Sequence, residues 1–199
     1  MAMGEKMSGF TKEIIIKTLF ELLNEKPLAK ITVKDIVERC GVNRNTFYYH
    51  FRDISDVVEY ALLRDVDKAF SRPVEVDSFL DCLEVLVNQI GENKKAMLHI
   101  YCSIQRETFT SALDKMCQYI VNQYVAHNFE KEIMEKEDMK VLMHFYKCVM
   151  TGVILDWLDH RMSYDLVEYA GRLRQLHGNN FEKTLENAAG TKPALLKIM

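Results

Sequence analysis

The chain is poor in the two residues that most often interrupt helices. Among its 199 residues proline occurs only at positions 27, 73 and 193, so residues 74–192 contain none. Because proline disrupts a helix interior, helices can run almost unbroken through that region. Glycine occurs only eight times, and apolar residues recur at steps of three and four instead of alternating as in strands. We therefore predict an all-α fold.

Cysteine lacks the spacing of a disulfide framework. Five cysteines, an odd number, are scattered along the chain without a C-x-x-C pair, and the N-terminal region lacks the apolar core of a signal peptide. No apolar run approaches the roughly 20 residues that a membrane-spanning helix needs. We expect a cytoplasmic protein with free thiols and no membrane span.

Motifs of catalysis and metal binding are missing as well. The six histidines include no pair four residues apart, and neither an H-E-x-x-H motif nor a cysteine and histidine cluster with zinc spacing occurs. The sequence contains no G-x-S-x-G motif, phosphate-binding loop or G-x-G-x-x-G motif. We therefore expect no enzymatic activity, no cofactor and no metal site.

The charge of the chain changes along its length. The net charge is −3 and the pI is near 6.1, which taken as a whole argues against a general binder of polyanions. Residues 1–52, however, hold nine Lys and Arg against six Asp and Glu, whereas residues 53–199 hold seventeen against twenty-three. Only the N-terminal region, residues 1–52, is therefore net basic.

The apolar periodicity predicts helices in two parts, divided at residues 71–73, where the sequence reads Ser-Arg-Pro. Residues 188–199, with Gly190 and Pro193, are expected to form a loose tail. The expected helices span about 11–26, 32–40, 43–51, 53 or 55 to 69, 77–91, 93–104, 107–128, 137–161 and 164–187.

Residues 32–51, TVKDIVERCGVNRNTFYYHF, follow the plan of a helix-turn-helix, with Gly41 in the turn. Thr32 with Asp35 three residues later resembles a capping box, and Asn43 is the expected N-cap of the second helix. Phe47 and Phe51 are four residues apart and share a face, so they should pack inward. The opposite face would then be free to bind a partner.

That outward face carries hydrogen-bonding groups and flat rings. Arg can bind the O6 and N7 atoms of guanine and Asn the N6 and N7 atoms of adenine, whereas Thr, Tyr and His suit phosphate oxygens. Each residue alone also has a structural interpretation, because adjacent tyrosines are often half-buried and a lone histidine is often structural. The combination on one face behind a glycine turn favours DNA binding. The face comprises Arg44, Asn45, Thr46, Tyr48, Tyr49 and His50.

This segment resembles the DNA-binding signature of TetR/AcrR-family transcriptional regulators over roughly residues 10–60. The resemblance implies that Thr32, Tyr48 and His50 bind phosphates and that Lys34, Arg44 and Asn45 lie at or near base edges, with Tyr49 between these roles. The family usually has a phosphate-binding Lys just after the recognition helix, where this chain has Ile54. Either Arg52 replaces it or non-specific affinity is weaker. The predicted DNA-binding residues are Thr32, Lys34, Asn43, Arg44, Asn45, Thr46, Tyr48, Tyr49, His50 and Arg52.

The resemblance also implies a DNA-binding domain at residues 1–54, a connecting helix at 55–72, and an effector-binding and dimerisation domain at 73–187. Segment 137–161 supports this, because its two apolar stripes must be covered on two sides. One stripe runs through Val141, Phe145, Cys148, Gly152 and Leu155. We predict that this segment and the next helix form a four-helix bundle across a two-fold axis, the alternative being that both stripes are core of a monomer. The predicted interface residues are Leu142, Val149, Gly152, Val153, Trp157, Leu166, Tyr169 and Leu173.

Methionine and tyrosine recur at helical spacing in the second part of the chain, where they could line an adaptable cavity for a small apolar or amphipathic effector. The same residue types at this spacing also form ordinary cores. The pocket residues would be Met97, Tyr101, Met116, Tyr119, Tyr124, Met143, Tyr146 and Met150.

The sequence thus predicts a ligand-responsive repressor that binds a palindromic operator in double-stranded DNA as a homodimer. One alternative is a TetR-like activator of the dihydroxyacetone-kinase activator type. Another, from a different class, is an all-α ligand-binding protein or enzyme in which the helix-turn-helix serves only as scaffold.

Overall fold

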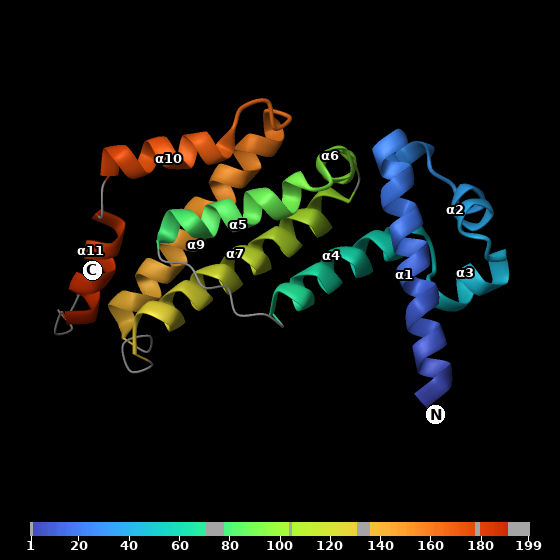
Figure 1. Cartoon of the computed structure of the whole chain (residues 1–199), viewed down its shortest axis with the longest axis horizontal. Helices are drawn as coiled ribbons and strands as arrows, with labels where there is room; N and C mark the ends of the chain where they lie inside the picture. The colour runs from blue at the N-terminus through green and yellow to red at the C-terminus, as the bar shows by residue number, and fades with distance from the viewer. Residues whose placement is uncertain (1, 71–77, 104, 131–135, 178–179, 191–199) are drawn as a thin grey trace, which may run out of the picture. The chain divides into compact units, whose positions relative to one another are not determined.

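A computed structural model of the chain describes residues 2–70, 78–103, 105–130, 136–177 and 180–190 (Figure 1). Across these residues the chain forms α-helices and one 3-10 helix and no strand, which confirms the all-α prediction. The elements are α1 (Ala2–Glu25), η1 (Leu28–Lys30), α2 (Val33–Cys40), α3 (Arg44–His50), α4 (Ile54–Phe70), α5 (Phe79–Gly91), α6 (Lys94–Tyr101), α7 (Arg106–Asn128), α9 (Glu137–Asp159), α10 (Leu166–His177) and α11 (Asn180–Gly190).

The last predicted helix is wrong, because segment 164–187 is divided into α10 and α11. Residues 178 and 179, between α10 and α11 in the sequence, lie outside the described residues. The tail expected from Ala188 also needs correction, since Ala188 is buried in α11, which ends at Gly190. The expected boundary at 71–73 and the rest of the tail, 191–199, lie outside the described residues.

The chain packs as two compact units. The first unit comprises Met1–Lys68 with Glu92–Ala112, and the second comprises Ala69–Gly91 with Leu113–Met199. The first unit therefore contains α6 and the beginning of α7 in addition to the helix-turn-helix. The division between the units is not a single point along the sequence.

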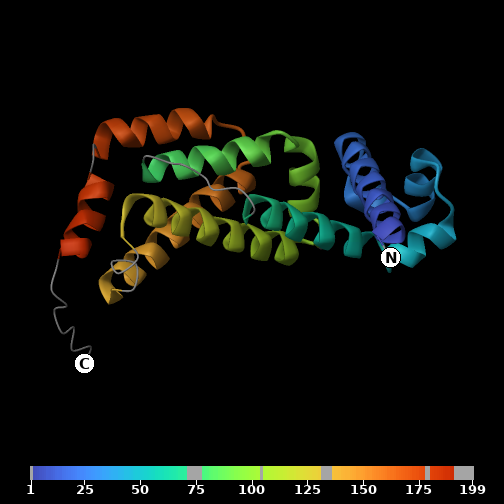
Figure 2. The same ribbon diagram turned by 60° about the horizontal axis from the view of Figure 1, so that its bottom comes forward.

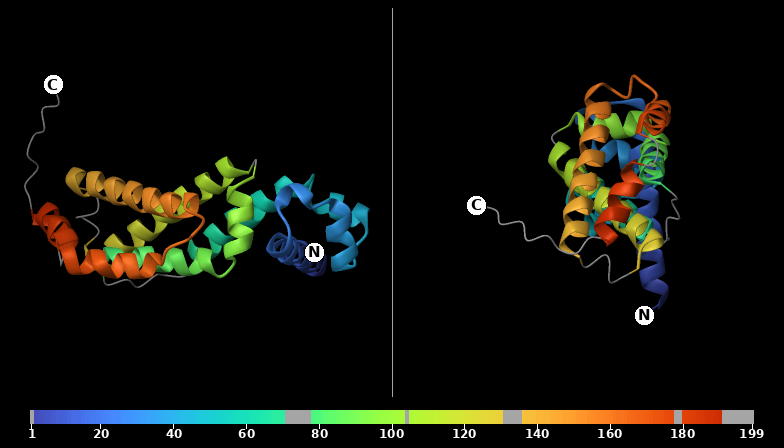
Figure 3. Two further views of the ribbon diagram at one scale, coloured as in Figure 1. Left: turned by 90° about the horizontal axis from the view of Figure 1, so that it is seen from above. Right: turned by 90° about the vertical axis from the view of Figure 1, so that its left-hand side faces the viewer.

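The core of the first unit is built from α1, α2 and α3. Ile15, Leu19 and Leu23 lie along α1 at four-residue steps and are fully buried, as are Ile36 of α2 and Phe47 of α3. Both α2 and α3 pack against α1 (Figures 1 and 3). The helix-turn-helix thus packs against an apolar stripe of α1.

Polar contacts also join α1 to later helices of the first unit. The Nδ1 atom of His99 in α6 lies 2.7 Å from the carbonyl oxygen of Leu23. The Arg64 guanidinium of α4 donates to the Glu13 carboxylate at 2.7 Å. Consequently α1 contacts α2, α3, α4 and α6 within this unit.

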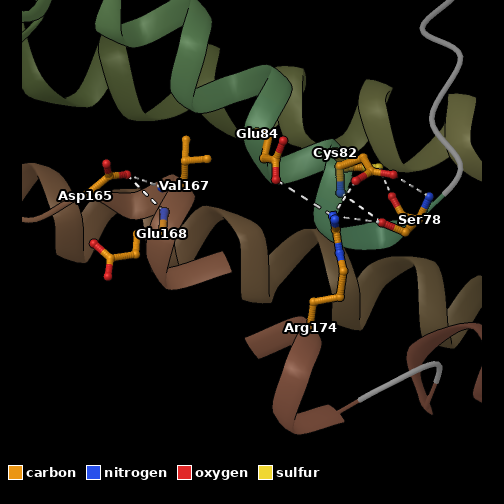
Figure 4. Close-up of polar contacts among 8 residues, drawn as sticks. Ser78, Cys82, Glu84, Asp165, Val167, Glu168 and Arg174 are labelled. Atoms are coloured by element: carbon orange, nitrogen blue, oxygen red, sulfur yellow. Dashed lines mark hydrogen bonds and ion pairs between the residues drawn. The ribbon is translucent and has the colours of Figure 1, made fainter. Parts of the chain in front are cut away.

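In the second unit, α10 lies alongside α5 (Figures 1 and 2). The Arg174 guanidinium of α10 pairs with Asp81 and lies 3.8 Å from a Glu84 oxygen and 3.4 Å from the Ser78 hydroxyl (Figure 4). Asp165 accepts hydrogen bonds from the first backbone N–H groups of α10 (Figure 4). One arginine therefore connects the C-terminal part of α10 with the N-terminal turn of α5.

Helix α9 is long and apolar enough, by length and composition alone, to cross a membrane. The expectation that no apolar run approaches the length of a membrane-spanning helix is therefore wrong. Core helices pass the same test, and α9 buries Met139, Tyr146, Met150 and Ile154 within the second unit. Val141 and Phe145 of the same helix are exposed, at 59% and 55%.

Candidate nucleic-acid interface

The start of α2 is fixed by a reciprocal cap. The Thr32 backbone N–H donates to Asp35 at 2.7 Å, and the Asp35 backbone N–H donates to the Thr32 hydroxyl at 3.2 Å. The Thr32 backbone hydrogen bond, followed by Lys26, lowers the pKa of Asp35 to about 2. Gly41, with φ of 71°, then ends α2 in the left-handed conformation that glycine adopts without strain. The predicted capping box and glycine turn are both confirmed.

Asn43 caps α3, as its sequence position predicts. Its side-chain oxygen accepts from the Thr46 backbone N–H at 2.8 Å and from the Thr46 hydroxyl at 3.1 Å. These two bonds use the Asn43 carbonyl oxygen and leave its side-chain NH₂ group as a donor beside the helix N-terminus. A helix N-terminus with backbone N–H groups suits a phosphate.

The inward face of α3 is apolar. Phe47 is fully buried and Phe51 is 3% exposed, with 6.1 Å between their ring centroids. They pack in the same core as Ile36 and Val37 of α2, which are also buried. This confirms the predicted inward face and sets the rotation of α3 about its axis.

The outward face of α3 is exposed. Tyr48 is 56% exposed and Tyr49 is 81% exposed, so Tyr49 is not a core residue. Arg44 and Asn45 are exposed as well, and within the described residues their side chains have no hydrogen-bond or ion-pair partner. Their donors and acceptors are therefore available to a ligand in solution.

His50 lies at the end of α3 and is half-buried. Burial, and after it the positive charge of Lys12, lowers the pKa of His50 below its ordinary value. The imidazole is thus neutral at neutral pH and donates through one ring nitrogen. Its ring also meets Tyr49 edge to face, with centroids 4.9 Å apart.

Lys12 of α1 reaches this end of α3, although the sequence analysis did not select it. Its ammonium lies 4.5 Å from the ring centroid of Tyr60 and 5.9 Å from that of Phe51. No carboxylate of the described residues forms an ion pair with it. Since Lys12 lies outside the helix-turn-helix, only the three-dimensional packing reveals its proximity to His50.

Arg52 is exposed but already paired. Its guanidinium lies 3.2 Å from an Asp56 oxygen, and its backbone N–H donates to the same carboxylate at 2.9 Å. These hydrogen bonds lower the pKa of Asp56. Ile54, which replaces the lysine of the family pattern, is half-buried at the start of α4.

Lys34 is the remaining predicted cation, and its ammonium lies 3.6 Å from the Glu38 carboxylate on the same exposed surface of α2. Surface pairs of this type contribute little and exchange readily with another anion. Lys34 can therefore still approach a nucleic acid.

The predicted effector residues do not gather in one unit. Met97 and Tyr101 belong to the first unit, and the other six belong to the second. All are buried except the half-buried Tyr119. The Tyr146 ring, for example, packs on Phe79 with centroids 4.6 Å apart. These contacts are those of core residues, which was the alternative interpretation.

The predicted dimer residues divide by exposure. Trp157 and Leu166 are buried inside the second unit, where the Trp157 indole N–H donates to the Tyr164 carbonyl oxygen at 2.9 Å, so their assignment to an intermolecular surface is corrected. Leu142, Val149, Val153 and Leu173 are half-buried, and Gly152 and Tyr169 are exposed.

Two family models match the chain. One, described as "Transcriptional regulator C-terminal region", matches residues 77–178, and the other, "Bacterial regulatory proteins, tetR family", matches residues 15–61. The second match covers the cap, the turn and the exposed face of α3. Together they cover most of the described chain.

Relatives and a solved structure agree with these matches. The chain is 38% identical over 63 residues to the HTH-type transcriptional regulator EthR of Mycobacterium tuberculosis, covering 31% of this chain and 29% of that protein. It is 27% identical over 88 residues to the uncharacterised HTH-type transcriptional regulator YvdT of Bacillus subtilis, covering 42% of this chain and 45% of that protein. The chain thus spans less than half of these curated relatives. A TetR transcriptional regulator from Rhodococcus sp. RHA1 shares the fold, with a TM-score of 0.55 and 14% identity over 98% of this chain and 100% of the other.

Proposed function

The chain belongs to the TetR family of DNA-binding transcriptional regulators, and we propose that it is a ligand-responsive repressor that binds a palindromic operator as a homodimer. The observation that carries the DNA-binding part is the exposed face of α3. Arg44, Asn45, Tyr48 and Tyr49 project from a helix whose other side is anchored by Phe47.

In this proposal α3 enters the major groove and its side chains divide into two roles. Arg44 and Asn45 read base edges, because they offer the paired donors and acceptors that guanine and adenine match. Thr32, Tyr48 and the N-terminus of α3 bind phosphates and set the register. His50 donates as a neutral imidazole, and Lys12 supplies a positive charge beside it.

The proposed homodimer follows from two features. One helix-turn-helix reads a half-site, so a palindromic operator needs two copies with recognition helices about 34–36 Å apart. The second unit also leaves an apolar side of α9 uncovered, with Val141 59% and Phe145 55% exposed. A second copy of the same face would bury these side chains in a two-fold interface.

Ligand response would be a population shift. In one state of the dimer the spacing of the two helix-turn-helix domains would not match the operator. A small apolar or amphipathic effector that binds better to that state would release the operator. Repression and cytoplasmic location are parts of the same proposal.

The rival proposal, an all-α ligand-binding protein or enzyme that does not bind DNA, is favoured by the pairing of Arg52 with Asp56. Retention on duplex DNA as a function of salt separates the two. A DNA-binding homodimer with several phosphate contacts loses affinity steeply as salt rises. Absence of retention at low salt by an intact dimer would support the rival.

A further inference from the structure

The exposed side of α9 carries a histidine and a cysteine that the DNA-binding function does not use. Val141, Phe145, Cys148 and Gly152 succeed one another at steps of four, three and four residues, so they share one helix face. Cys148 lies inside this row, and it is exposed together with His144, one turn earlier. The face is therefore apolar with one polar pair inside it.

The two side chains already have the separation of ligands on a tetrahedral ion. The His144 Nε2 atom lies 3.7 Å from the Cys148 Sγ atom. Zinc binds thiolate sulfur at about 2.3 Å and imidazole nitrogen at about 2.0–2.1 Å, which at a tetrahedral angle places sulfur and nitrogen about 3.6 Å apart. Side chains four residues apart on a helix commonly share such an ion.

The charge of Lys147 is compensated by a carboxylate on the other side of α9 from the pair. Lys147 lies between the two ligands in sequence, but its side chain is 13% exposed and its ammonium pairs with Asp114 at 2.7 Å. Its charge is thus compensated mainly by Asp114. A thiolate at Cys148 would be compensated by the metal ion itself.

The pair supplies only half of a zinc site. Within the described residues, no group of three or more histidine, cysteine, aspartate or glutamate side chains could hold an ion in one chain. A structural zinc site needs four ligands. A two-fold axis through the exposed face of α9 would bring a second, identical pair.

We propose that His144 and Cys148 of two chains together form a Cys₂His₂ site for zinc between the paired α9 helices. This inference rests on the homodimer proposed above. Sequence spacing alone does not single out this pair, because two ligands on one helix are an incomplete metal site within one chain. Because the ion binds the dimer and not the monomer, its binding energy strengthens the association of the two chains.

Three of the four other cysteines provide contrasts. Cys82 and Cys117 are buried, and burial raises the pKa of Cys82 to about 12 and that of Cys117 to about 11, so they remain thiols. Cys102 is exposed like Cys148 and is not paired with a histidine within the described residues. Cys102→Ser is therefore the matched control.

The test uses the reduced full-length chain and zinc alone. Equilibrium dialysis is expected to give one zinc per two chains, and sedimentation to show dimers at a protein concentration at least about tenfold lower than in a chelator. His144→Gln and Cys148→Ser should each abolish both effects, and Cys102→Ser should leave both unchanged. Cobalt in place of zinc should show thiolate absorption that Cys148→Ser removes.

Measurements on the same samples distinguish this inference from the proposed function. A chain that dimerises and binds DNA in chelator but takes up no zinc would overturn the metal site alone. Zinc bound at one per chain, or retained by Cys148→Ser, would overturn it too. A chain that stays monomeric with and without zinc would overturn both the site and the homodimer, whereas retention on DNA is read independently.

Discussion

The Asp56 carboxylate accepts hydrogen bonds from both the backbone N–H and the guanidinium of Arg52, at 2.9 and 3.2 Å. Arg52 is the first cation after α3. The family pattern instead has a phosphate-binding lysine two residues later, where this chain has Ile54. The charge of Arg52 is therefore partly neutralised in the free protein. Lys12 approaches the end of α3 from α1 and forms no ion pair with a carboxylate of the described residues.

Asp56→Asn is expected to strengthen DNA binding. The substitution frees the Arg52 guanidinium for a phosphate, so the dependence of log affinity on log salt should steepen by about 0.9. Retention of the variant on an arbitrary duplex across a salt series measures this slope. Adding Arg52→Ala should cancel the gain, whereas a gain that persists in the double variant would show that Arg52 is not its source.

Lys12→Ala is expected to weaken binding to all sequences equally and to lower the salt slope by about 0.9, because one phosphate contact is lost. Lys17→Ala is the control, since Lys17 also lies on α1 and is 80% exposed beside Glu21. Equal slopes for the two variants would remove Lys12 from the interface.

Asp35 predicts a pH dependence of folding. Its pKa is lowered to about 2, so its carboxylate stabilises the fold fully above its ordinary pKa near 4, and this stabilisation disappears as the pH falls towards 2. The difference in free energy of unfolding between the wild type and Asp35→Asn should shrink over that interval. A difference that stays constant from pH 6 to pH 2 would contradict the assigned cause.

Inward and outward residues of α3 should separate stability from binding. Phe47→Ala removes a fully buried ring and should cost about 3–5 kcal/mol in the free energy of unfolding. Tyr49→Ala removes an 81% exposed ring and should leave thermal stability nearly unchanged while lowering DNA affinity. Denaturant unfolding and DNA retention of both variants test this. A strongly destabilised Tyr49→Ala would mean that α3 is rotated differently.

Local features of the helix-turn-helix could be predicted from the sequence. The capping box of Thr32 and Asp35, the cap of Asn43 and the glycine turn each depend on residues within four positions of one another. The inward placement of Phe47 and Phe51 follows from helical periodicity alone. Helix capping, glycine turns and helical periodicity were therefore sufficient to predict these features.

Features that depend on packing could not be predicted in this way. Apolar periodicity placed Trp157 on an intermolecular surface, because a stripe does not reveal which neighbour covers it, and the structure buries it beside Tyr164. Lys12 was missed since its role depends on the approach of α1 to α3. The pairing of Arg52 with Asp56 required the direction of a long side chain, which sequence spacing leaves open.

The central claim, that the exposed face of α3 reads DNA sequence, is tested most directly with Arg44→Ala. A palindrome is selected from random DNA with the wild-type protein, and the affinities of wild type, Arg44→Ala and Lys17→Ala are compared on that palindrome and on variants changed at single base pairs. We predict that Arg44→Ala loses about 1–3 kcal/mol of discrimination at particular G·C pairs, whereas Lys17→Ala keeps the wild-type pattern. Unchanged discrimination by Arg44→Ala at every position would contradict the account.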